Sequence, residues 1–126
     1  MKKIPFSKIT FGREEEKAIR DVIKSGWVVL GPKTEEFEKA FAKYVGAKYA
    51  VFVDSGTSAL ILSLGVADYK DFVTIPSLTF VSGAEVVHNA GLEIRFGDIS
   101  IDNFCLDKKY GNAMPTNFAG ALCPRR

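Results

Sequence analysis

The sequence predicts an α/β chain with a mostly parallel sheet and crossover helices. Three segments of strand length occur, at residues 49–53, 72–75 and 92–96, and the first of them is continuously apolar. Helical patterns of about ten residues alternate with them, which is typical of βαβ units with parallel strands. Two amphipathic helices precede the first run, and the 126 residues contain no internal repeat or low-complexity tract. A chain of this length corresponds to at most one domain.

The composition fits a globular protein and argues against two classes of partner. Hydrophobic residues make up 47% of the chain and charged residues 25%, close to the globular average. A net charge of +2 is too small to indicate nucleic acid or a membrane as a partner. No apolar run reaches the roughly 18 residues that a membrane span needs, and the basic N-terminus lacks the apolar stretch of a secretory signal. We therefore expect a cytoplasmic protein that binds neither.

The first predicted elements are two helices that follow an irregular arm. The first covers residues 14–24, where acidic residues suit the positive N-terminal end of a helix. Gly26 is expected to end it. The second covers residues 33–44 with Thr34 as its N-cap, and Gly46 is expected to end it. Apolar residues lie at helical spacing on both helices: Ile19, Val22, Ile23, Phe37, Phe41 and Tyr44.

The sheet is expected to begin with residues 49–53, which are continuously apolar, as in a strand buried on both faces. The remaining elements are predicted from apolar runs and from the Gly and Pro residues between them. They are helices at 58–66 and 80–89, strands at 72–75 and 92–96, and a final strand at 112–116.

The most informative stretch is Ser55-Gly56-Thr57-Ser58, where a buried strand is expected to lead into a helix. The first N–H groups of a helix are unpaired, and the helix dipole adds about half a positive charge there. Phosphates bind to such a turn at the carboxyl end of a parallel strand, and the Thr57 and Ser58 hydroxyls can add donors. The alternative is that these hydroxyl residues only cap the helix.

Phe80 lies in a second turn from a strand to a helix, between residues 72–75 and 80–89. Both turns are expected at the same edge of the sheet. An aromatic ring beside a phosphate site can stack on a flat ligand, which contributes about 0.5–1.5 kcal/mol beyond burial. The alternative is a core side chain, since the chain has ten Phe residues. Together, the two turns suggest a phosphorylated planar cofactor.

The sequence resembles the N-terminal part of the DegT/DnrJ/StrS family of sugar aminotransferases over about residues 4–107. Several short motifs agree with the family in order and spacing. They are Ile4-Pro5-Phe6, Ser25-Gly26-Trp27, Gly31-Pro32, Phe37-Glu38, residues 55–60, residues 76–82, Ala90-Gly91 and Gly97-Asp98-Ile99. The resemblance implies an incomplete large domain of the aspartate-aminotransferase type (fold type I). Residues 1–46 would form the arm and two helices, and residues 47–126 would begin the central sheet.

The resemblance also implies the cofactor and the roles of individual residues. The family uses pyridoxal 5′-phosphate to move an amino group, usually from glutamate, onto a keto-sugar nucleotide. Gly56, Thr57 and Ser58 would hold the cofactor phosphate, and Phe80 would stack on its ring. Trp27 would lie near the substrate entrance and the subunit interface, or would only pack locally. The resemblance implies a homodimer or a partner chain.

The resemblance further implies that residues 1–126 hold no catalytic residue. The family's Schiff-base Lys and the acidic residue at the pyridine nitrogen lie further along the chain, and no Lys here occurs in a matching motif. We therefore expect these residues to form about a third of a family member that is inactive alone. One alternative is a non-catalytic paralogue or one half of a split enzyme. A generic nucleotide-binding domain is disfavoured, because no Gly-x-Gly-x-x-Gly or Walker-type run is present.

A remote alternative is a retroviral-type aspartic protease, because Asp54-Ser55-Gly56 follows two apolar residues as in the motif of that class. Such enzymes are dimers whose two Asp residues share a proton. They are all-β proteins, however, whereas a helix is predicted directly after this motif. No metal site is expected, because one His and the distant Cys105 and Cys123 do not match any known ligand spacing. Both cysteines are expected to be free thiols.

Overall fold

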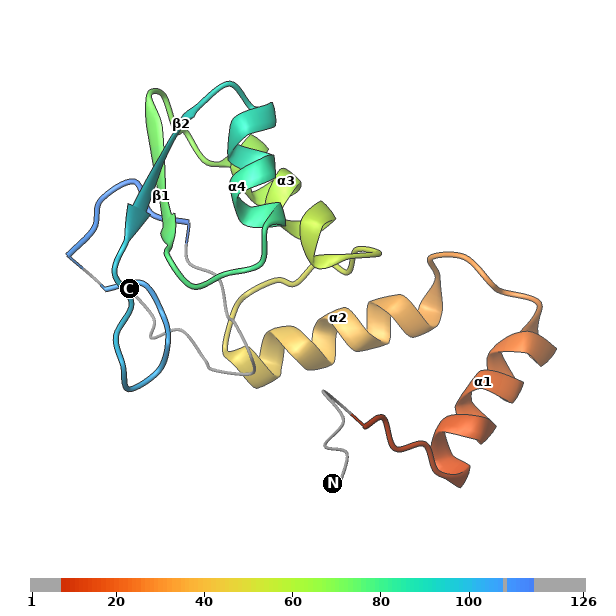
Figure 1. The fold of residues 1–126 in the computed structure, drawn as a ribbon. Coiled ribbons are helices and arrows are strands. Elements are labelled where there is room, and N and C mark those ends of the chain that lie inside the picture. The colour runs from red at the N-terminus through yellow and green to blue at the C-terminus, as the bar shows by residue number, and fades with distance from the viewer. Residues whose placement is uncertain (1–7, 108, 115–126) are drawn as a thin grey trace. The chain divides into compact units, whose positions relative to one another are not determined.

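The computed structural model describes residues 8–107 and 109–114, and the chain divides into two compact units (Figure 1). The N-terminal unit, Met1–Phe52, contains helices α1 (Arg13–Ser25) and α2 (Pro32–Val45). The C-terminal unit, Val53–Arg126, contains α3 (Gly56–Val66), β1 (Phe72–Pro76), α4 (Ser82–Asn89) and β2 (Glu93–Gly97). The predicted α/β class with parallel strands and crossover helices is confirmed.

Helix α1 matches the predicted helix at residues 14–24 and is fixed at both ends by its own residues. At the start, the Glu15 carboxylate accepts a hydrogen bond of 2.7 Å from the Gly12 N–H. That backbone bond lowers the pKa of Glu15, because it stabilises the charged form. At the end, Gly26 adopts the left-handed conformation with φ of 71°, which a residue with a side chain rarely takes.

Helix α2 begins at Pro32, so the prediction of Thr34 as its N-cap was wrong. Gly31 is the N-cap, and Pro32 occupies the first helical position. Proline suits that position because its fixed φ is helical and its missing N–H has no partner there anyway. The predicted end at Gly46 is confirmed, with φ of 62°.

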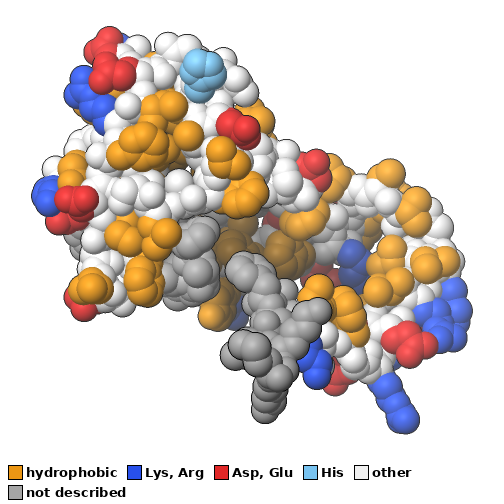
Figure 2. All heavy atoms as spheres, in the orientation of Figure 1, with side chains coloured by type: hydrophobic (Ala, Val, Ile, Leu, Met, Phe, Trp, Pro, Cys, Tyr) orange, Lys and Arg blue, Asp and Glu red, His pale blue; other side chains and the backbone are white. Residues whose placement is uncertain are grey.

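Both helices of the N-terminal unit leave their apolar side chains open to solvent. Helix α1 has no buried residue, and in α2 only Ala42 is buried. Ile19 and Ile23 on α1 and Phe37 on α2 are exposed, although they lie on the predicted apolar faces. Figure 2 shows hydrophobic side chains on the visible surface of this protein.

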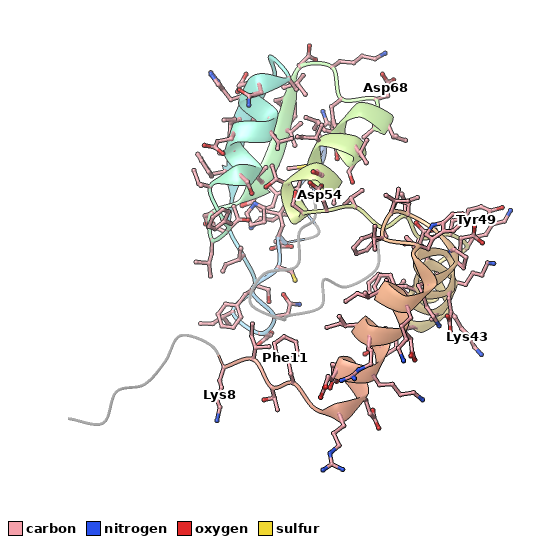
Figure 3. All side chains as sticks on the ribbon, turned by 90° about the vertical axis from the view of Figure 1, so that its right-hand side faces the viewer. Lys8, Phe11, Lys43, Tyr49, Asp54 and Asp68 are labelled. Atoms are coloured by element: carbon pink, nitrogen blue, oxygen red, sulfur yellow. The ribbon has the colours of Figure 1, made fainter. Side chains whose placement is uncertain are left out.

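The expected strand at residues 49–53 does not form in the described part of the chain, and this prediction was wrong. The residues are as apolar as predicted, but a strand exists only through its hydrogen bonds to a neighbouring strand. None of the described strands pairs with them. Tyr49 and Val51 are therefore exposed, and Figure 3 shows Tyr49 on the surface.

The C-terminal unit is built on strands β1 and β2, which are parallel and in register from Phe72↔Glu93 to Pro76↔Gly97. Helix α4 connects them and packs on both, which makes a βαβ unit, and α3 packs beside α4. The predicted strands at 72–75 and 92–96 and the helix at 58–66 are confirmed within one or two residues. The predicted helix at 80–89 begins at Ser82 instead, because Phe80 and Val81 form the turn before it.

The core of this unit lies between β1 and the two helices. Val73 and Ile75 alternate along β1 and are completely buried. Their neighbours in the core come from α3, from α4 and from the segment after β2: Leu64, Val86, Val87 and Met114. Helices α3 and α4 therefore cover the same face of the sheet, the face that carries Val73 and Ile75.

The segment around Ala113 lies along the edge of β1 that β2 does not occupy. Thr74 and Ala113 form a parallel bridge, with bonds of 2.8 Å from Thr74 N–H to Asn112 O and 3.0 Å from Met114 N–H to Thr74 O. This bridge lies within the predicted strand at 112–116, of which residues 115 and 116 are outside the described residues. Both edges of β1 are thus occupied. Among the residues described, no helix is long and apolar enough to cross a membrane.

Candidate functional site

The predicted phosphate turn lies at the N-terminus of α3 and is shaped by Ser55. The Ser55 side chain caps the helix by accepting a hydrogen bond of 3.1 Å from the Ser58 N–H. Its hydroxyl also lies 3.0 Å from the Ser58 hydroxyl. The Ser58 N–H is therefore engaged within the turn. Capping, the alternative that the sequence offered for these hydroxyl residues, is therefore present at Ser55.

Two backbone donors remain at this turn, the N–H groups of Gly56 and Thr57. Neither bonds to another residue in the described part of the chain. Gly56 is exposed, and a Cβ built on it would meet no atom within 4 Å. The space beside Gly56 is therefore open, and the helix dipole adds positive potential at this end of the helix. The turn has backbone donors of the kind that bind one phosphate group.

The two candidate turns lie at one edge of the C-terminal unit. Figure 1 shows that α3 and α4 both begin at the edge where β1 and β2 end. Phe80 lies in the turn between β1 and α4, and 68% of its surface is exposed. The alternative that Phe80 is a core side chain does not hold in this structure. An exposed ring at the ligand-binding edge is able to stack on a planar group.

The same edge contains a contact that the sequence argument missed. The Tyr110 hydroxyl accepts a hydrogen bond of 3.1 Å from the Asp98 N–H, just beyond the end of β2. The Tyr110 ring also lies against Gly97, where a Cβ would come within 3.0 Å of the ring. No local sequence pattern signals this pair, because Tyr110 comes from a later loop. The contact fixes the backbone where β2 leaves the sheet.

Trp27 folds back onto its own loop. Its indole Nε1 donates a hydrogen bond of 2.9 Å to the Leu30 carbonyl oxygen. The ring lies over Gly31, where a Cβ would overlap it. Even so, 55% of the Trp27 surface is exposed. The structure thus shows the local packing role of Trp27, and its ring retains a free face.

The described residues contain no group of three His, Cys, Asp or Glu side chains that could hold a metal ion. Cys105 is buried, and its thiol lies 3.3 Å from the Asn103 carbonyl oxygen. Cys123 is outside the described residues. Asp54 lies in the turn before α3 (Figure 3) and leads directly into that helix. A helix directly after this Asp argues against an aspartic protease of the retroviral type, because such enzymes are all-β proteins.

The chain belongs to the DegT/DnrJ/EryC1/StrS aminotransferase family, whose model matches residues 10–122. The match extends past residue 107, where the motif resemblance becomes weaker. A relative with 37% identity over 125 residues is the spore coat polysaccharide biosynthesis protein SpsC of Bacillus subtilis (strain 168). The alignment covers 97% of this chain but 30% of SpsC. The chain therefore spans about a third of the length of this relative.

Solved structures of similar fold include two enzymes of sugar metabolism. One is Spr1654 of Streptococcus pneumoniae, assigned as a sugar aminotransferase, with a TM-score of 0.72 and 33% identity. The other is GDP-4-keto-6-deoxy-D-mannose-3-dehydratase of E. coli with bound hydrated PLP, with a TM-score of 0.70 and 30% identity. The similarity covers 82% of this chain in both cases, but 27% and 28% of those chains. The chain thus has an incomplete fold of the aspartate-aminotransferase type.

The two candidate turns fit the two ends of pyridoxal phosphate. The free N–H groups at the start of α3 suit the phosphate, and the exposed ring of Phe80 suits the pyridine. The cofactor, when bound, supplies an electron sink for amino-group transfer. The solved Spr1654 structures include a PLP-form and a PMP-form. Family and neighbours together imply dependence on this cofactor.

Proposed function

We propose that this chain is the N-terminal portion of a pyridoxal-phosphate-dependent aminotransferase that acts on keto-sugar nucleotides. The sugar-related names of the relatives and the GDP-linked sugar of the E. coli dehydratase support this substrate class. In the parent enzyme the amino group comes from an amino donor, usually glutamate in the family, and the proposed working form is a homodimer or a complex with a partner chain in the cytoplasm. Residues 1–46 form the arm and two helices, and residues 47–126 begin the central sheet.

The open N-terminus of α3 is the observation that carries this proposal. Gly56 and Thr57 present N–H groups that bond to no described residue, and a Cβ built on Gly56 would meet no atom within 4 Å. In the proposal these groups bind the cofactor phosphate, and the Thr57 and Ser58 hydroxyls complete the contact. Ser55 keeps the turn in shape by holding Ser58. Phosphate binding at this point anchors the cofactor without a charged side chain.

Phe80 provides the stacking face for the cofactor ring, and Trp27 lies near the entrance for the sugar nucleotide. The Lys that forms the Schiff base comes from the part of the family fold beyond the segment matched here. Residues 1–126 therefore bind and orient the cofactor but do not carry out the transfer alone. The matched segment is 30% of SpsC, so most of that relative lies outside it.

A charge placed in the turn tests the phosphate role without breaking the helix. The test protein is a fusion of residues 1–126 to the part of SpsC that follows its matched segment. In it, Gly56→Asp adds a carboxylate to the first turn of α3, where a negative charge favours the helix but repels phosphate. We expect cofactor affinity to fall by about tenfold or more, which equals about 1.4 kcal/mol. Equilibrium dialysis measures the affinity.

Gly56→Ala is the matched control, because a Cβ at this position meets no atom within 4 Å. It should retain cofactor affinity within about threefold. Helix content by circular dichroism should be the same in both variants. If Gly56→Asp binds the cofactor as tightly as Gly56→Ala does, the phosphate is bound elsewhere and the proposed role of the turn is wrong.

Phe80→Ala tests the stacking role in the same fusion. Loss of about 0.5–1.5 kcal/mol of stacking corresponds to a two- to tenfold weaker cofactor complex. Phe96→Ala is the control, since Phe96 is on β2 and is exposed to nearly the same extent, 66% against 68%. If the two variants bind the cofactor with equal affinity, the proposed stacking role of Phe80 is wrong, whether both affinities are weakened or both are unchanged.

A further inference from the structure

The loop between α1 and α2 holds Trp27 by both its backbone and its ring. The backbone N–H of Trp27 donates a hydrogen bond of 3.1 Å to the Ser25 hydroxyl, which itself donates one of 2.7 Å to the Val22 carbonyl oxygen. The indole Nε1 of Trp27 donates another, of 2.9 Å, to the Leu30 carbonyl oxygen. All these partners lie within five residues of Trp27. Local bonds alone therefore fix the orientation of this ring.

The fixed ring is covered on one side and open to solvent on the other. Gly31 lies against the indole so closely that a Cβ on Gly31 would overlap the ring, so a glycine is what lets the ring take this place. Even so, 55% of the Trp27 surface is exposed. Tryptophan is highly buried on average in folded proteins. The loop thus keeps a large, flat, apolar surface in contact with water and in a single orientation.

The surroundings of the ring suit an uncharged flat group on an anionic molecule. Residues 25–32 contain no charged side chain, so the loop has no carboxylate that would repel phosphate groups. Val28 and Val29 are 73% and 74% exposed and extend the apolar surface beside the ring. A flat aromatic group gains most from such a surface, because it can stack on the open face of the indole.

We propose that the open face of Trp27 stacks on the nucleobase of the sugar nucleotide. The base is the flat heteroaromatic part of this substrate, and every base has a face that can stack on an aromatic side chain. Because the ring is already fixed by Ser25, Leu30 and Gly31, little side-chain freedom is lost when the base binds. The inference rests on the proposed function in one respect only, that a sugar nucleotide is the ligand.

Nucleotide binding to the fusion of residues 1–126 with the following part of SpsC tests this contact. The probes are GDP, UDP and dTDP, measured by equilibrium dialysis without pyridoxal phosphate, so the result does not depend on the cofactor. Trp27→Ala should weaken the nucleotide complex by about five- to 140-fold, which equals about 1–3 kcal/mol. In the unchanged fusion, the NMR signals of the base protons should shift upfield on binding, because they lie over the indole ring.

Two substitutions of Trp27 separate stacking from simple apolar contact. Trp27→Phe keeps a flat ring and should retain nucleotide affinity better than Trp27→Ala does. Trp27→Leu keeps an apolar side chain without a flat face, so it should bind as weakly as Trp27→Ala. Neither substitution changes the charge of the loop.

Two further variants leave Trp27 in the chain. Gly31→Ala displaces the ring without removing it and should weaken the nucleotide complex by about fivefold or more. Val29→Ala is the matched control, because Val29 is in the same loop and is 74% exposed. This control should keep the affinity within about twofold. Helix content by circular dichroism should be the same in all variants.

Several results would overturn the proposal. Unchanged affinity in Trp27→Ala contradicts it, and so does a fusion that binds none of the three nucleotides. Equal affinities of Trp27→Phe and Trp27→Leu, or an equal loss in Val29→Ala, would mean that the loop acts through packing alone. If Trp27→Ala weakens GDP-mannose but not GDP, the ring contacts the sugar instead of the base.

The outcome for Trp27 is separate from that for the cofactor. If the fusion binds pyridoxal phosphate and Trp27→Ala leaves nucleotide affinity unchanged, this inference fails while the proposed cofactor role stands. If Trp27→Ala weakens nucleotide binding but the fusion binds no pyridoxal phosphate, the proposed function fails while the stacking contact stands.

Discussion

Gly97 is where one added carbon should have the largest effect on the C-terminal unit. It is the last residue of β2 and is buried. A Cβ at this position would lie 2.6 Å from Leu106 Cδ1 and 3.0 Å from both Thr74 Cγ2 and Tyr110 Cδ2. Contacts below 3.0 Å do not occur without movement of a neighbour. Gly97→Ala therefore forces at least Leu106 to move.

The cost of this movement follows from how tightly the neighbours are held. Leu106 is 5% exposed and Thr74 is 4% exposed, so neither has open space to enter. Thr74 also bonds through its backbone to Asn112 and Met114. Inserting a carbon into such a core costs about 1–3 kcal/mol. We expect Gly97→Ala to lower the free energy of unfolding by that amount.

Urea unfolding followed by circular dichroism measures the change, and hydrogen exchange at β1 assigns it to the C-terminal unit. Gly65→Ala is the control: it is in α3, with no atom within 4 Å of the added Cβ. That variant should be more stable by about 0.5–1 kcal/mol, because Ala favours a helix more than Gly does. A Gly97→Ala variant as stable as the unchanged chain would refute the close packing at the end of β2.

Two further predictions concern the N-terminal unit. The hydrogen bond from the Gly12 N–H lowers the pKa of Glu15, so this capping bond stabilises α1 above pH 4.5 and is lost as the pH falls through the lower folded pKa. The NMR signal of the Gly12 amide should therefore titrate with a midpoint below pH 4.5, and a midpoint at or above 4.5 would contradict this. In Gly31→Ala, the new Cβ displaces the indole ring of Trp27. The Nε1 proton of Trp27 should then exchange faster with solvent, and the fluorescence emission of this single Trp should shift to the red. An unchanged indole signal would disprove the contact between the ring and Gly31.

The helices and parallel strands could be predicted from the sequence because local residues determine them. Gly26 and Gly46 end α1 and α2 in the left-handed conformation that Gly takes most readily. Strands β1 and β2 alternate with α4 in a pattern that only a βαβ unit explains well. The family was also predictable, since several short motifs in one order are more specific than any of them alone.

The errors came from features that depend on distant residues or on competition between neighbours. Residues 49–53 have the composition of a strand, but composition does not say whether a partner strand is present. Thr34 is a good capping residue, but Pro32 starts the helix earlier. The contact between Tyr110 and the Asp98 N–H joins two loops, so no local pattern predicts it. The roles of Gly56 and Phe80 stay predictions.

The measurement that tests the central claim most directly is the absorption spectrum of the fusion of residues 1–126 to the remaining part of SpsC, before and after addition of glutamate. The account predicts that the fusion binds about one equivalent of pyridoxal phosphate and that glutamate changes the spectrum as the amino group is transferred. Gly56→Asp should need about tenfold more pyridoxal phosphate to reach the same signals while the protein stays folded. A folded fusion that binds no pyridoxal phosphate would contradict the account.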